Sequence, residues 1–428
     1  MTFTEAIAHP TAPLGYLAKV FPSGVDKKTV DGEQPVRLCN YTDVYYRDRI
    51  TSDIAFMEAT ATEAEVARFT LLPGDVVITK DSETADDIAI PALVTEDLGG
   101  VVLGYHSALI RPDTSKLDPR FLFWALMGRR SASYFETKAR GVTRVGLRAD
   151  DMAAVPVPMP PLQVQRRVAD MLDDETTRID TLIAKNNEVL RLSDLRREAT
   201  ISLYVSGGMD ARDPVEAFVE QPAMKHGWEL TKLKYVAQGV TVGIVVRPAE
   251  LYVDSPEEGV PCLRGVNVKR GRVVDTDLRF IGHAGNAANP KSQLRRGDVV
   301  VVRTGEAGAA AVVPEWALGG NCVDLLLVRT GPRLDPTFAE FVLNSDFVRR
   351  QVARGSVGSI QSHFNVASLS EAIIAVPEIE QQRMIVADLQ DRLAPLRRLR
   401  EKVERQVELL NMRRRALITA AVTGEINV

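Results

Sequence analysis

The chain contains few cysteines and histidines, and neither residue type is clustered. Its 428 residues include three cysteines, Cys39, Cys262 and Cys322, and five dispersed histidines. Disulfide frameworks need paired cysteines, and zinc sites need cysteines or histidines at close spacing. We therefore expect no structural disulfide and no metal site. An odd number of scattered cysteines also suits the reducing cytoplasm, which is the location we predict.

Long apolar runs are absent as well. No stretch reaches the ~20 apolar residues that a membrane-spanning helix needs. Residues 1–16 carry Glu5 and no apolar run. We therefore expect neither a membrane span nor a signal peptide. With 45% hydrophobic and 26% charged residues, the chain has an ordinary globular composition and enough length for two or three domains.

Sequence motifs for catalysis are also missing. The chain has no Gly-rich loop ending in Gly-Lys-Ser/Thr, which argues against an NTP-driven motor. It has no Asn/Asp-Pro-Pro-aromatic motif of the kind that a DNA methyltransferase needs, and no Ser/His/Asp grouping stands out. We predict a protein without catalytic residues of its own.

The net charge of -4 conceals a strongly uneven distribution of charge. Residues 264–303 hold nine Lys/Arg against three Asp, and residues 129–148 hold six against one Glu. Residues 53–97 reverse the balance, with eleven acidic side chains against Arg68 and Lys80. A single basic run is usually a solvated surface, but two runs in corresponding places favour a nucleic-acid partner.

Those places correspond because the chain is an internal repeat. Residues 160–208 align with residues 377–425 at a constant offset of 217, with 14 of 49 positions identical, where chance would give roughly three. The same offset relates Leu117-Asp118-Pro119 to Leu334-Asp335-Pro336. Upstream, Gly74-Asp75-Val76-Val77 matches Gly297-Asp298-Val299-Val300 across loops of unequal length. The duplication thus covers nearly the whole chain.

Each half begins with a strand-rich part. Short Val/Ile runs such as 76–79 and 299–303 are separated by Gly, Pro and Asp, a pattern typical of strands and turns. Asp118-Pro119 and Asp335-Pro336 predict short helices, because a capping residue precedes a proline at the first helical position.

Each half ends with a long helix. Apolar residues recur every seven positions in the second helix, which indicates a coiled-coil seam: Leu389, Leu396, Val403, Leu410 and Leu417. The first helix starts the matching seam with Leu172 and Ile179, places Asn186 in it, and adds a neighbouring stripe that includes Leu182. Asn186 either fixes the register or faces solvent. Pro395 should kink the second helix or restart it. The alternative is a helix packed on a globular core, but five consecutive heptads favour the coiled coil.

Two similar heads, each followed by a long helix, pack most simply with the helices antiparallel and related by a pseudo-twofold axis. We therefore predict an α+β fold in which two β-rich domains are separated by a long antiparallel two-helix coiled coil. The predicted segments are a β-rich domain at 1–158, a helix at 159–205, a linker at 206–225, a second β-rich domain at 226–376 and a second helix at 377–428. A helix over 172–203 would span about 48 Å, against the roughly 34–36 Å between half-sites on one face of DNA.

Several of these segments resemble the specificity subunits of type I restriction-modification systems. Pro160-Pro161-Leu162-Gln163-Val164-Gln165 looks like the start of a conserved helix of that family, and its counterpart is residues 377–382. The tail 416–428 and the opening Trp228-Glu229-Leu230 also resemble the family pattern, as do the two Gly-Asp-Val-Val strands.

The resemblance implies two target recognition domains that read a split, asymmetric site on double-stranded DNA. It also implies that the paired helices dock two modification (methyltransferase) subunits, to which restriction (motor-nuclease) subunits can add. S-adenosylmethionine, ATP and Mg are then expected only on the partner subunits. The first domain departs from the pattern, because it lacks the Trp-Glu opening and carries the acidic stretch, which leaves open which of its faces meets DNA.

Candidate DNA-binding residues are those whose side chains suit phosphates or base edges, since Arg and Lys bind guanine or phosphate and Gln suits adenine. They are Lys80, Lys138, Arg140, Arg144 and Arg148 in the first domain and Arg264, Lys269, Arg270, Arg303, Gln361 and His363 in the second. The remaining alternative function is a coiled-coil adaptor that binds only proteins, which would explain the helices but not two basic, duplicated heads.

Overall fold

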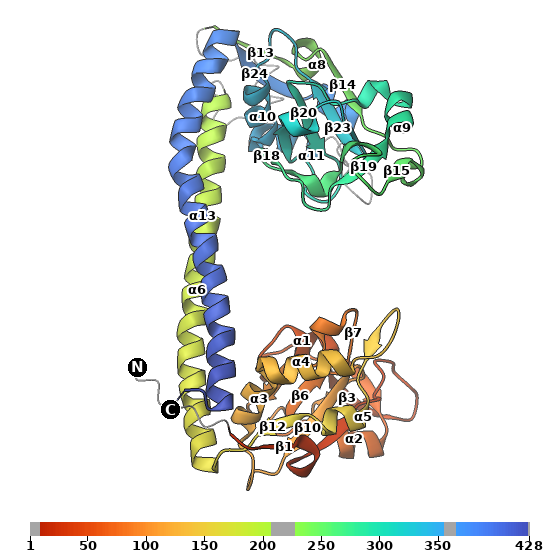
Figure 1. The fold of residues 1–428 in the computed structure, drawn as a ribbon, viewed down its shortest axis with the longest axis vertical. Helices are drawn as coiled ribbons and strands as arrows, with labels where there is room; N and C mark the ends of the chain where they lie inside the picture. The colour runs from red at the N-terminus through yellow and green to blue at the C-terminus, as the bar shows by residue number, and fades with distance from the viewer. Residues whose placement is uncertain (1–8, 207–226, 355–364, 427–428) are drawn as a thin grey trace. The chain divides into compact units, whose positions relative to one another are not determined.

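The computed structural model describes residues 9–206, 227–354 and 365–426. They form two compact units (Figure 1). Unit 1 comprises Met1–Asn187 with Glu404–Val428, and unit 2 comprises Glu188–Val403. The two long helices, α6 (Leu162–Val205) and α13 (Ile379–Thr423), therefore each contribute one end to each unit. No helix within the described residues is long and apolar enough to cross a membrane.

The head of unit 1 is built on a five-stranded sheet, whose strand order is β2-β10-β6-β8-β4. Only β4 and β8 run parallel in it. The strands are β2 (Ala18–Pro22), β4 (Arg49–Ile50), β6 (Val76–Thr79), β8 (Pro91–Val94) and β10 (Ser107–Pro112). A three-stranded sheet places β3 (Gln34–Cys39) between β5 (Met57–Ala61) and β9 (Val102–Leu103). Two two-stranded ribbons complete the head: β1 (Thr11–Pro13) pairs with β12 (Pro156–Pro158), and β7 (Asp81–Ser82) pairs with β11 (Val145–Gly146).

Short helices surround these strands. They are η1 (Leu14–Tyr16), α1 (Tyr41–Tyr45), α2 (Glu63–Phe69), η2 (Ala85–Asp87), α3 (Pro119–Met127), α4 (Arg129–Lys138) and α5 (Ala149–Ala153). Every residue of β6 is buried, and the helix α3 covers the sheet with Phe121, Phe123 and Trp124.

The head of unit 2 repeats this plan. Its main sheet has the order β14-β23-β20-β21, formed by β14 (Gly239–Val242), β20 (Asp298–Val302), β21 (Ala310–Val312) and β23 (Leu325–Arg329). A second sheet contains four strands: β15 (Tyr252–Val253), β16 (Gly259–Leu263), β19 (Arg279–Gly282) and β22 (Asn321–Cys322). Two two-stranded ribbons complete the head. One pairs β13 (Trp228–Lys232) with β24 (Ile373–Pro377), and the other pairs β17 (Val268–Lys269) with β18 (Arg272–Val273). Its helices are α8 (Leu233–Val236), η3 (Pro248–Leu251), η4 (Gly265–Asn267), α9 (His283–Ala288), η5 (Pro290–Ser292), η6 (Glu315–Ala317), α10 (Pro336–Asn344), α11 (Asp346–Arg354) and α12 (Val366–Ser370).

The repeat predicted from the sequence is confirmed element by element. The strand series β2-β10-β6-β8 has its counterpart in β14-β23-β20-β21, and α3 to α6 correspond to α10 to α13. The two Asp-Pro helix starts also agree with the prediction. Asp118 accepts hydrogen bonds from the N–H groups of Arg120 and Phe121, and Asp335 accepts the equivalent pair in unit 2. The predicted 206–225 linker lies outside the described residues apart from Ser206.

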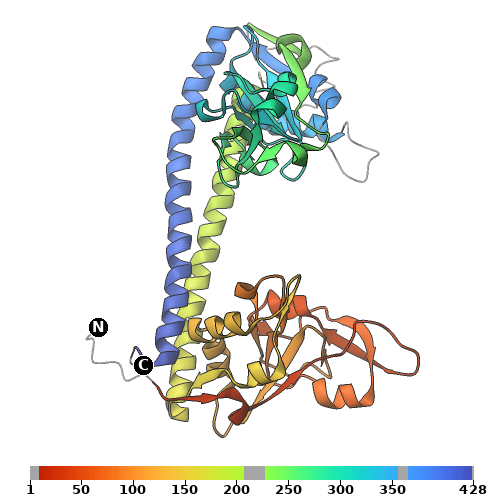
Figure 2. The same cartoon turned by 45° about the vertical axis from the view of Figure 1, so that its right-hand side comes forward.

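The long helices pack antiparallel in each unit, side by side (Figures 1 and 2). In unit 1 Arg414 of α13 contacts Asp180 of α6 at 3.0 Å. In unit 2 Arg400 pairs with Asp194, and the Tyr204 hydroxyl donates to Asp388 at 2.5 Å. In these pairs the residue number rises along α6 while the residue number of the contacting side chain falls along α13. The predicted antiparallel pairing is therefore confirmed.

The seam follows the predicted heptads only in part. Leu172, Ile179, Leu389 and Val403 are buried, whereas Leu396, Leu410, Leu417 and Asn186 are half-buried. Leu182 is 45% exposed and therefore lies off the seam. The predicted restart at Pro395 is wrong, because α13 runs without interruption through that residue.

A buried glutamine fixes the start of each long helix to the head of the same unit. The Gln165 side chain is fully buried, and its Nε2 donates to the carbonyls of Lys116 (3.0 Å) and Pro160 (2.9 Å). Its Oε1 accepts from the Asp118 N–H at 2.8 Å. Gln382 makes the same three bonds in unit 2, to Arg333, Pro377 and Asp335, each at 2.8 Å.

An arginine near the end of each long helix makes a second attachment. Arg414 contacts Asp48 of head 1 at 2.7 Å, and its guanidinium lies 6.0 Å from the Trp124 ring. Its repeat equivalent, Arg197, is half-buried beside Glu340 of head 2, and desolvation lowers the pKa of Arg197 and raises that of the more deeply buried Glu340. Each head is therefore held by the beginning of one helix and the end of the other.

We expect Gln165→Ala to lower the melting temperature of the protein measurably. The substitution leaves one N–H and two carbonyls without a partner, and each buried polar group so left costs about 1–3 kcal/mol. Differential scanning calorimetry checks this. Gln163→Ala, two residues earlier and on the exposed side of the helix, is the control and should melt like the unchanged protein. Equal melting temperatures for the two variants would contradict the assigned role.

Candidate nucleic-acid interface

The predicted basic residues of unit 1 gather where β6 leaves the main sheet. Lys80 directly follows Thr79, the last residue of β6. Its N–H donates to the carbonyl of His106 at 2.8 Å, and its carbonyl accepts from the Leu147 N–H at 2.9 Å. The end of β6, the turn before β10 and the segment after β11 therefore meet at Lys80.

A tight loop beside this point carries two further cations. Arg140 and Gly146 exchange two backbone hydrogen bonds, of 3.1 and 2.9 Å, which close the loop 140–146. Gly141 has φ +148°, and a Cβ there would lie 1.9 Å from the Arg144 carbonyl, so only glycine fits. Arg140 and Arg144 are exposed on this loop, which joins α4 to β11 next to β7 (Figure 1).

Three of these cations keep their charge available to an external anion. Within the described part of the chain, Lys80, Arg140 and Arg144 form no ion pair with a carboxylate. Lys138, by contrast, lies 5.6 Å over the ring of Tyr134, and Arg148 is 3.6 Å from Asp151. The five predicted residues thus share one region, but their electrostatic environments differ.

His106 is part of the same region, although sequence reasoning did not select it. It has φ +69°, its Nδ1 lies 2.7 Å from Asp81 Oδ2, and its Nε2 lies 3.5 Å from Arg144 Nη1. Its ring packs at 3.9 Å from that of Tyr105. A lone histidine before a buried strand gives no sequence signal, because its partners are 25 and 38 residues away.

Aromatic side chains of α1 were also missed. Tyr41 stacks on Tyr45 at 5.5 Å, and Tyr46, which follows the helix, is 74% exposed. The Tyr45 hydroxyl donates to Asp87 at 2.6 Å, and this hydrogen bond raises the pKa of Tyr45 to about 12. Exposed aromatic rings near cations are suited to stacking on bases or sugars.

Part of the acidic stretch in head 1 has an internal structural role. Asp75 is buried and receives two hydrogen bonds of 2.7 Å from Arg111. Glu96 accepts from the Ser52 N–H at 2.6 Å, and Asp97 accepts from that of Gly99 at 2.9 Å. These carboxylates stabilise the turns of the head and so do not by themselves exclude an anionic partner.

The predicted residues of unit 2 are mostly engaged within the protein. Arg264 pairs with Asp277 at 2.7 Å, and Arg303 pairs with Asp324 at 2.5 Å. Lys269 is half-buried on β17. Gln361 and His363 lie outside the described residues. In sequence their segment corresponds to the loop of unit 1, because Ala353-Arg354-Gly355 repeats Ala139-Arg140-Gly141.

Arg270 differs from the expectation most clearly. Its guanidinium pairs with Glu198 of α6 and lies 3.5 Å from Glu306. The turn between β17 and β18 therefore rests on the helix, and the charge of Arg270 is compensated there. This geometry favours a role in attaching head 2 to α6 over one in binding an external anion.

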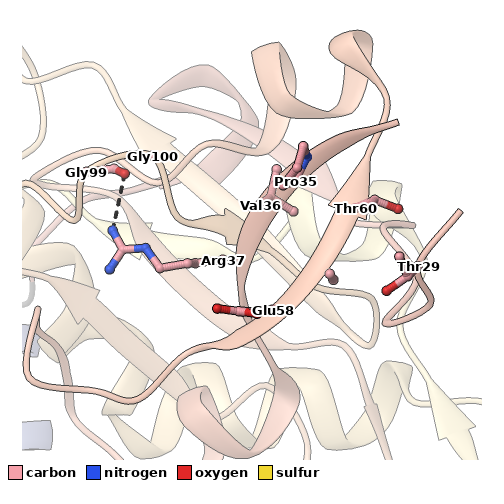
Figure 3. Close-up of a pocket in the computed structure, with 9 residues that line it drawn as sticks. Thr29, Pro35, Val36, Arg37, Glu58, Thr60, Gly99 and Gly100 are labelled. Atoms are coloured by element: carbon pink, nitrogen blue, oxygen red, sulfur yellow. Dashed lines mark hydrogen bonds between the residues drawn. The ribbon is translucent and has the colours of Figure 1, made fainter. Parts of the chain in front are cut away.

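A hollow of about 500 Å³ lies against β3 and β5 in unit 1 (Figure 3). Arg37 lines it, but its guanidinium donates to the carbonyls of Leu98 and Gly99. The other lining groups include Glu58, Thr60 and two glycines. They form no convergent set that would hold a cofactor.

The described residues likewise assemble neither a metal site nor a reactive cysteine. Among the described residues no three His, Cys, Asp or Glu side chains are placed to hold a metal ion. All three cysteines are buried, and burial raises the pKa of the Cys262 thiol to about 12 and raises those of Cys39 and Cys322 as well. A reactive thiolate needs the opposite shift.

We expect Arg270→Ala to destabilise the protein rather than to change its binding to anions. The Arg270–Glu198 pair is about three-quarters buried, and contacting residues of this kind couple by ~0.5–3 kcal/mol in a double-mutant cycle. Chemical denaturation of Arg270→Ala, Glu198→Ala and the double variant measures that coupling. Arg272→Ala, on the exposed side of the same hairpin, is the control, and a coupling near zero would argue against the attachment.

Comparisons with known proteins agree on one family. Residues 40–191 match the family model described as type I restriction modification DNA specificity domain. The chain is 22% identical over 319 residues to the MjaVIII specificity subunit of Methanocaldococcus jannaschii, covering 73% of this chain and 71% of that one. It is 22% identical over 340 residues to the EcoBI specificity subunit of Escherichia coli, covering 76% and 69%. A solved chain from work on complex assembly and conformational transition of the type I R-M system shares the fold, with a TM-score of 0.62, 19% identity and full coverage of both chains.

Proposed function

Because the chain belongs to the type I restriction-modification specificity family, we propose that it reads a split, asymmetric site on double-stranded DNA for such a complex. The observation that supports this best is that Lys80, Arg140 and Arg144 of unit 1 lie together and form no ion pair with a carboxylate among the described residues. Exposed Lys and Arg neutralise phosphates, and the loops between them can reach base edges.

The chain acts in this proposal as a recognition subunit without chemistry of its own. Within the described residues all three thiols are buried, and no group of His, Cys, Asp or Glu side chains is placed to hold a metal ion, which agrees with such a role. S-adenosylmethionine, ATP and Mg would belong to the partner subunits. We also propose a cytoplasmic location, which three cysteines without a disulfide suit.

The long helices offer matching apolar surfaces for two identical partners. Three exposed positions on α6 are apolar again 217 residues later on α13: Leu182 with Leu399, Leu192 with Leu409, and Leu195 with Met412. Each is 39–50% exposed. Unit 1 carries Leu182, Leu409 and Met412, and unit 2 carries Leu399, Leu192 and Leu195. We call each trio an apolar set.

Each unit thus exposes one complete apolar set, to which both helices contribute. Apolar side chains repeated at half exposure on a helix pair mark a protein contact surface. We infer that each set docks one modification subunit, with restriction subunits adding to that assembly. An adaptor that binds only proteins would use the same sets, but it would have no need for the cations of the heads.

We expect Arg140→Ala and Arg144→Ala to weaken binding to duplex DNA and to reduce its dependence on salt. Each lost phosphate contact lowers the slope of log affinity against log salt by about one. Fluorescence anisotropy over a salt series, on the full chain with its modification subunits, measures both effects. Lys116→Ala removes an exposed cation beyond the opposite end of β10 and should behave like the unchanged protein. Salt-independent binding by the unchanged protein would favour the adaptor.

We expect the double substitution Leu192→Glu and Leu195→Glu to remove one of two bound modification subunits. Two carboxylates in the apolar set of unit 2 would have to be desolvated on docking, whereas unit 1 keeps its own set. Native mass spectrometry reports the stoichiometry. Leu203→Glu is the matched control, because Leu203 is 52% exposed on the same helix but its repeat equivalent is Ala420. An unchanged stoichiometry in the double variant would contradict this docking surface.

A further inference from the structure

Each apolar set is bordered by one lysine and one arginine. The two lysines are repeat equivalents, 217 residues apart, and so are the two arginines. They are Lys185 and Arg413 in unit 1, and Lys402 and Arg196 in unit 2. Residues three or four apart on a helix are neighbours on its surface, so Lys185 lies beside Leu182 and Arg413 beside Leu409. The same spacings recur in unit 2.

The pairing of the helices brings the lysines level with apolar side chains of the other helix. In unit 1 the 3.0 Å contact of Arg414 with Asp180 places Lys185 level with Leu409, because the helices are antiparallel. An ion pair between the helices gives unit 2 the same register. In each unit the lysine and the apolar side chains of both helices are therefore at the same height along the pair.

The four bordering cations carry charge that the protein does not neutralise. All four are exposed, and among residues 9–206, 227–354 and 365–426 none of them forms an ion pair. Other charged side chains beside the sets form ion pairs within their own helix: Arg178 with Glu175, Arg405 with Glu408, and Arg191 with Glu188. In unit 2 Arg398 and Glu401 add one charge of each sign. The lysine and the arginine therefore give each set an excess of positive charge.

This chemistry fits a protein better than DNA. Lys and Arg bind phosphates, but the half-exposed leucine and methionine side chains between them offer nothing to a phosphate. A protein can cover those apolar side chains and place carboxylates against the cations around them. A second copy of this chain would bring cations against cations if the same surfaces met, which is unfavourable. The matching occupant is a different protein with an acidic contact face.

We propose that each modification subunit docks with an apolar centre surrounded by carboxylates, which pair with Lys185 and Arg413 in unit 1 and with Lys402 and Arg196 in unit 2. This inference rests on the proposed function, in which each apolar set docks one modification subunit. Charges at the rim of an interface accelerate the encounter and orient the partner more than they add affinity. The association rate constant is therefore the quantity that these cations should control.

The test uses the full chain carrying Leu192→Glu and Leu195→Glu, which should retain only the docking site of unit 1. Lys185→Glu and Arg413→Glu are added to it, and stopped-flow fluorescence follows the binding of purified modification subunit over a salt series. Electrostatic steering raises association rates by roughly 10–10³-fold. We therefore expect the charge reversal to slow association at low salt by about 10-fold or more, and to weaken its dependence on salt.

Two matched variants separate the local effect from folding and from net charge. Lys185→Arg with Arg413→Lys keeps both charges and should associate at the unchanged rate. Arg167→Glu with Arg415→Glu makes the same change of charge on the same two helices. Arg167 and Arg415 are exposed and form no ion pair in the described part of the chain, but their repeat equivalents are not basic. This control should associate faster than the charge-reversed set.

Two results would overturn the inference. One is an association rate that the charge reversal at Lys185 and Arg413 lowers no more than the control does. The other is normal association together with weaker binding to duplex DNA, which would make these cations phosphate contacts. If the chain with Leu192→Glu and Leu195→Glu still bound two modification subunits, the docking surface of the proposed function would fail instead, so the two failures are distinguishable.

Discussion

The attachment of each head to two different helices is the constraint on which the rest of the structure depends. A buried glutamine, Gln165 or Gln382, joins the head to the start of the helix that follows it, through three hydrogen bonds. An arginine, Arg414 or Arg197, joins it to the end of the other helix. The apolar core of each unit crosses the same boundary, since Ile418 and Val422 pack with head 1 and Ile201 and Val205 with head 2. Neither half of the chain can complete a unit by itself.

The attachment of the heads is the same in both units, whereas the residues at the ends of the main-sheet strands differ. The glutamine clamp, the capped Asp-Pro helix and the order of four main-sheet strands are the same in both heads, and the clamp and the cap satisfy polar groups that would be costly to leave without a partner. The strand ends differ: Lys80, Asp81 and His106 in one head correspond to Arg303, Thr304 and Asp324 in the other. The residues at these strand ends therefore differ between the heads while the attachment of each head to the helices is kept.

The sequence predicted the elements that depend on local or periodic signals. The offset of 217 residues, the Asp-Pro caps and the heptads of the second helix led to the repeat, to α3 and α10, and to the antiparallel helices. Of the two outcomes predicted for Pro395, the restart is wrong, because α13 continues through that residue, and the kink stays a prediction. Leu182 was predicted to lie in a stripe next to the seam, and the structure leaves it exposed. Heptad spacing alone does not show which of two neighbouring stripes is buried.

The candidate site was predicted less well, because a sequence does not show which carboxylate each Arg or Lys side chain will pair with. Arg270 and Glu198 are 72 residues apart, and no local pattern joins them. Arg303 and Asp324 meet only because β20 and β23 pair in one register. Arg140 and Arg144 were predicted from a basic run, and they form no ion pair with a carboxylate among the described residues, so their role in binding DNA stays a prediction. His106 and Tyr46 became candidates only when their neighbours were known.

The most direct test is to exchange one head. Residues Thr11–Pro158, from β1 to β12, would be replaced by the corresponding region of a related specificity protein that reads a different site, and the methylated motif would be mapped in cells that express the modification subunits. The structure predicts that one half of a split motif changes and the other half persists. A motif that changes in both halves, or that is not split at all, would contradict the account.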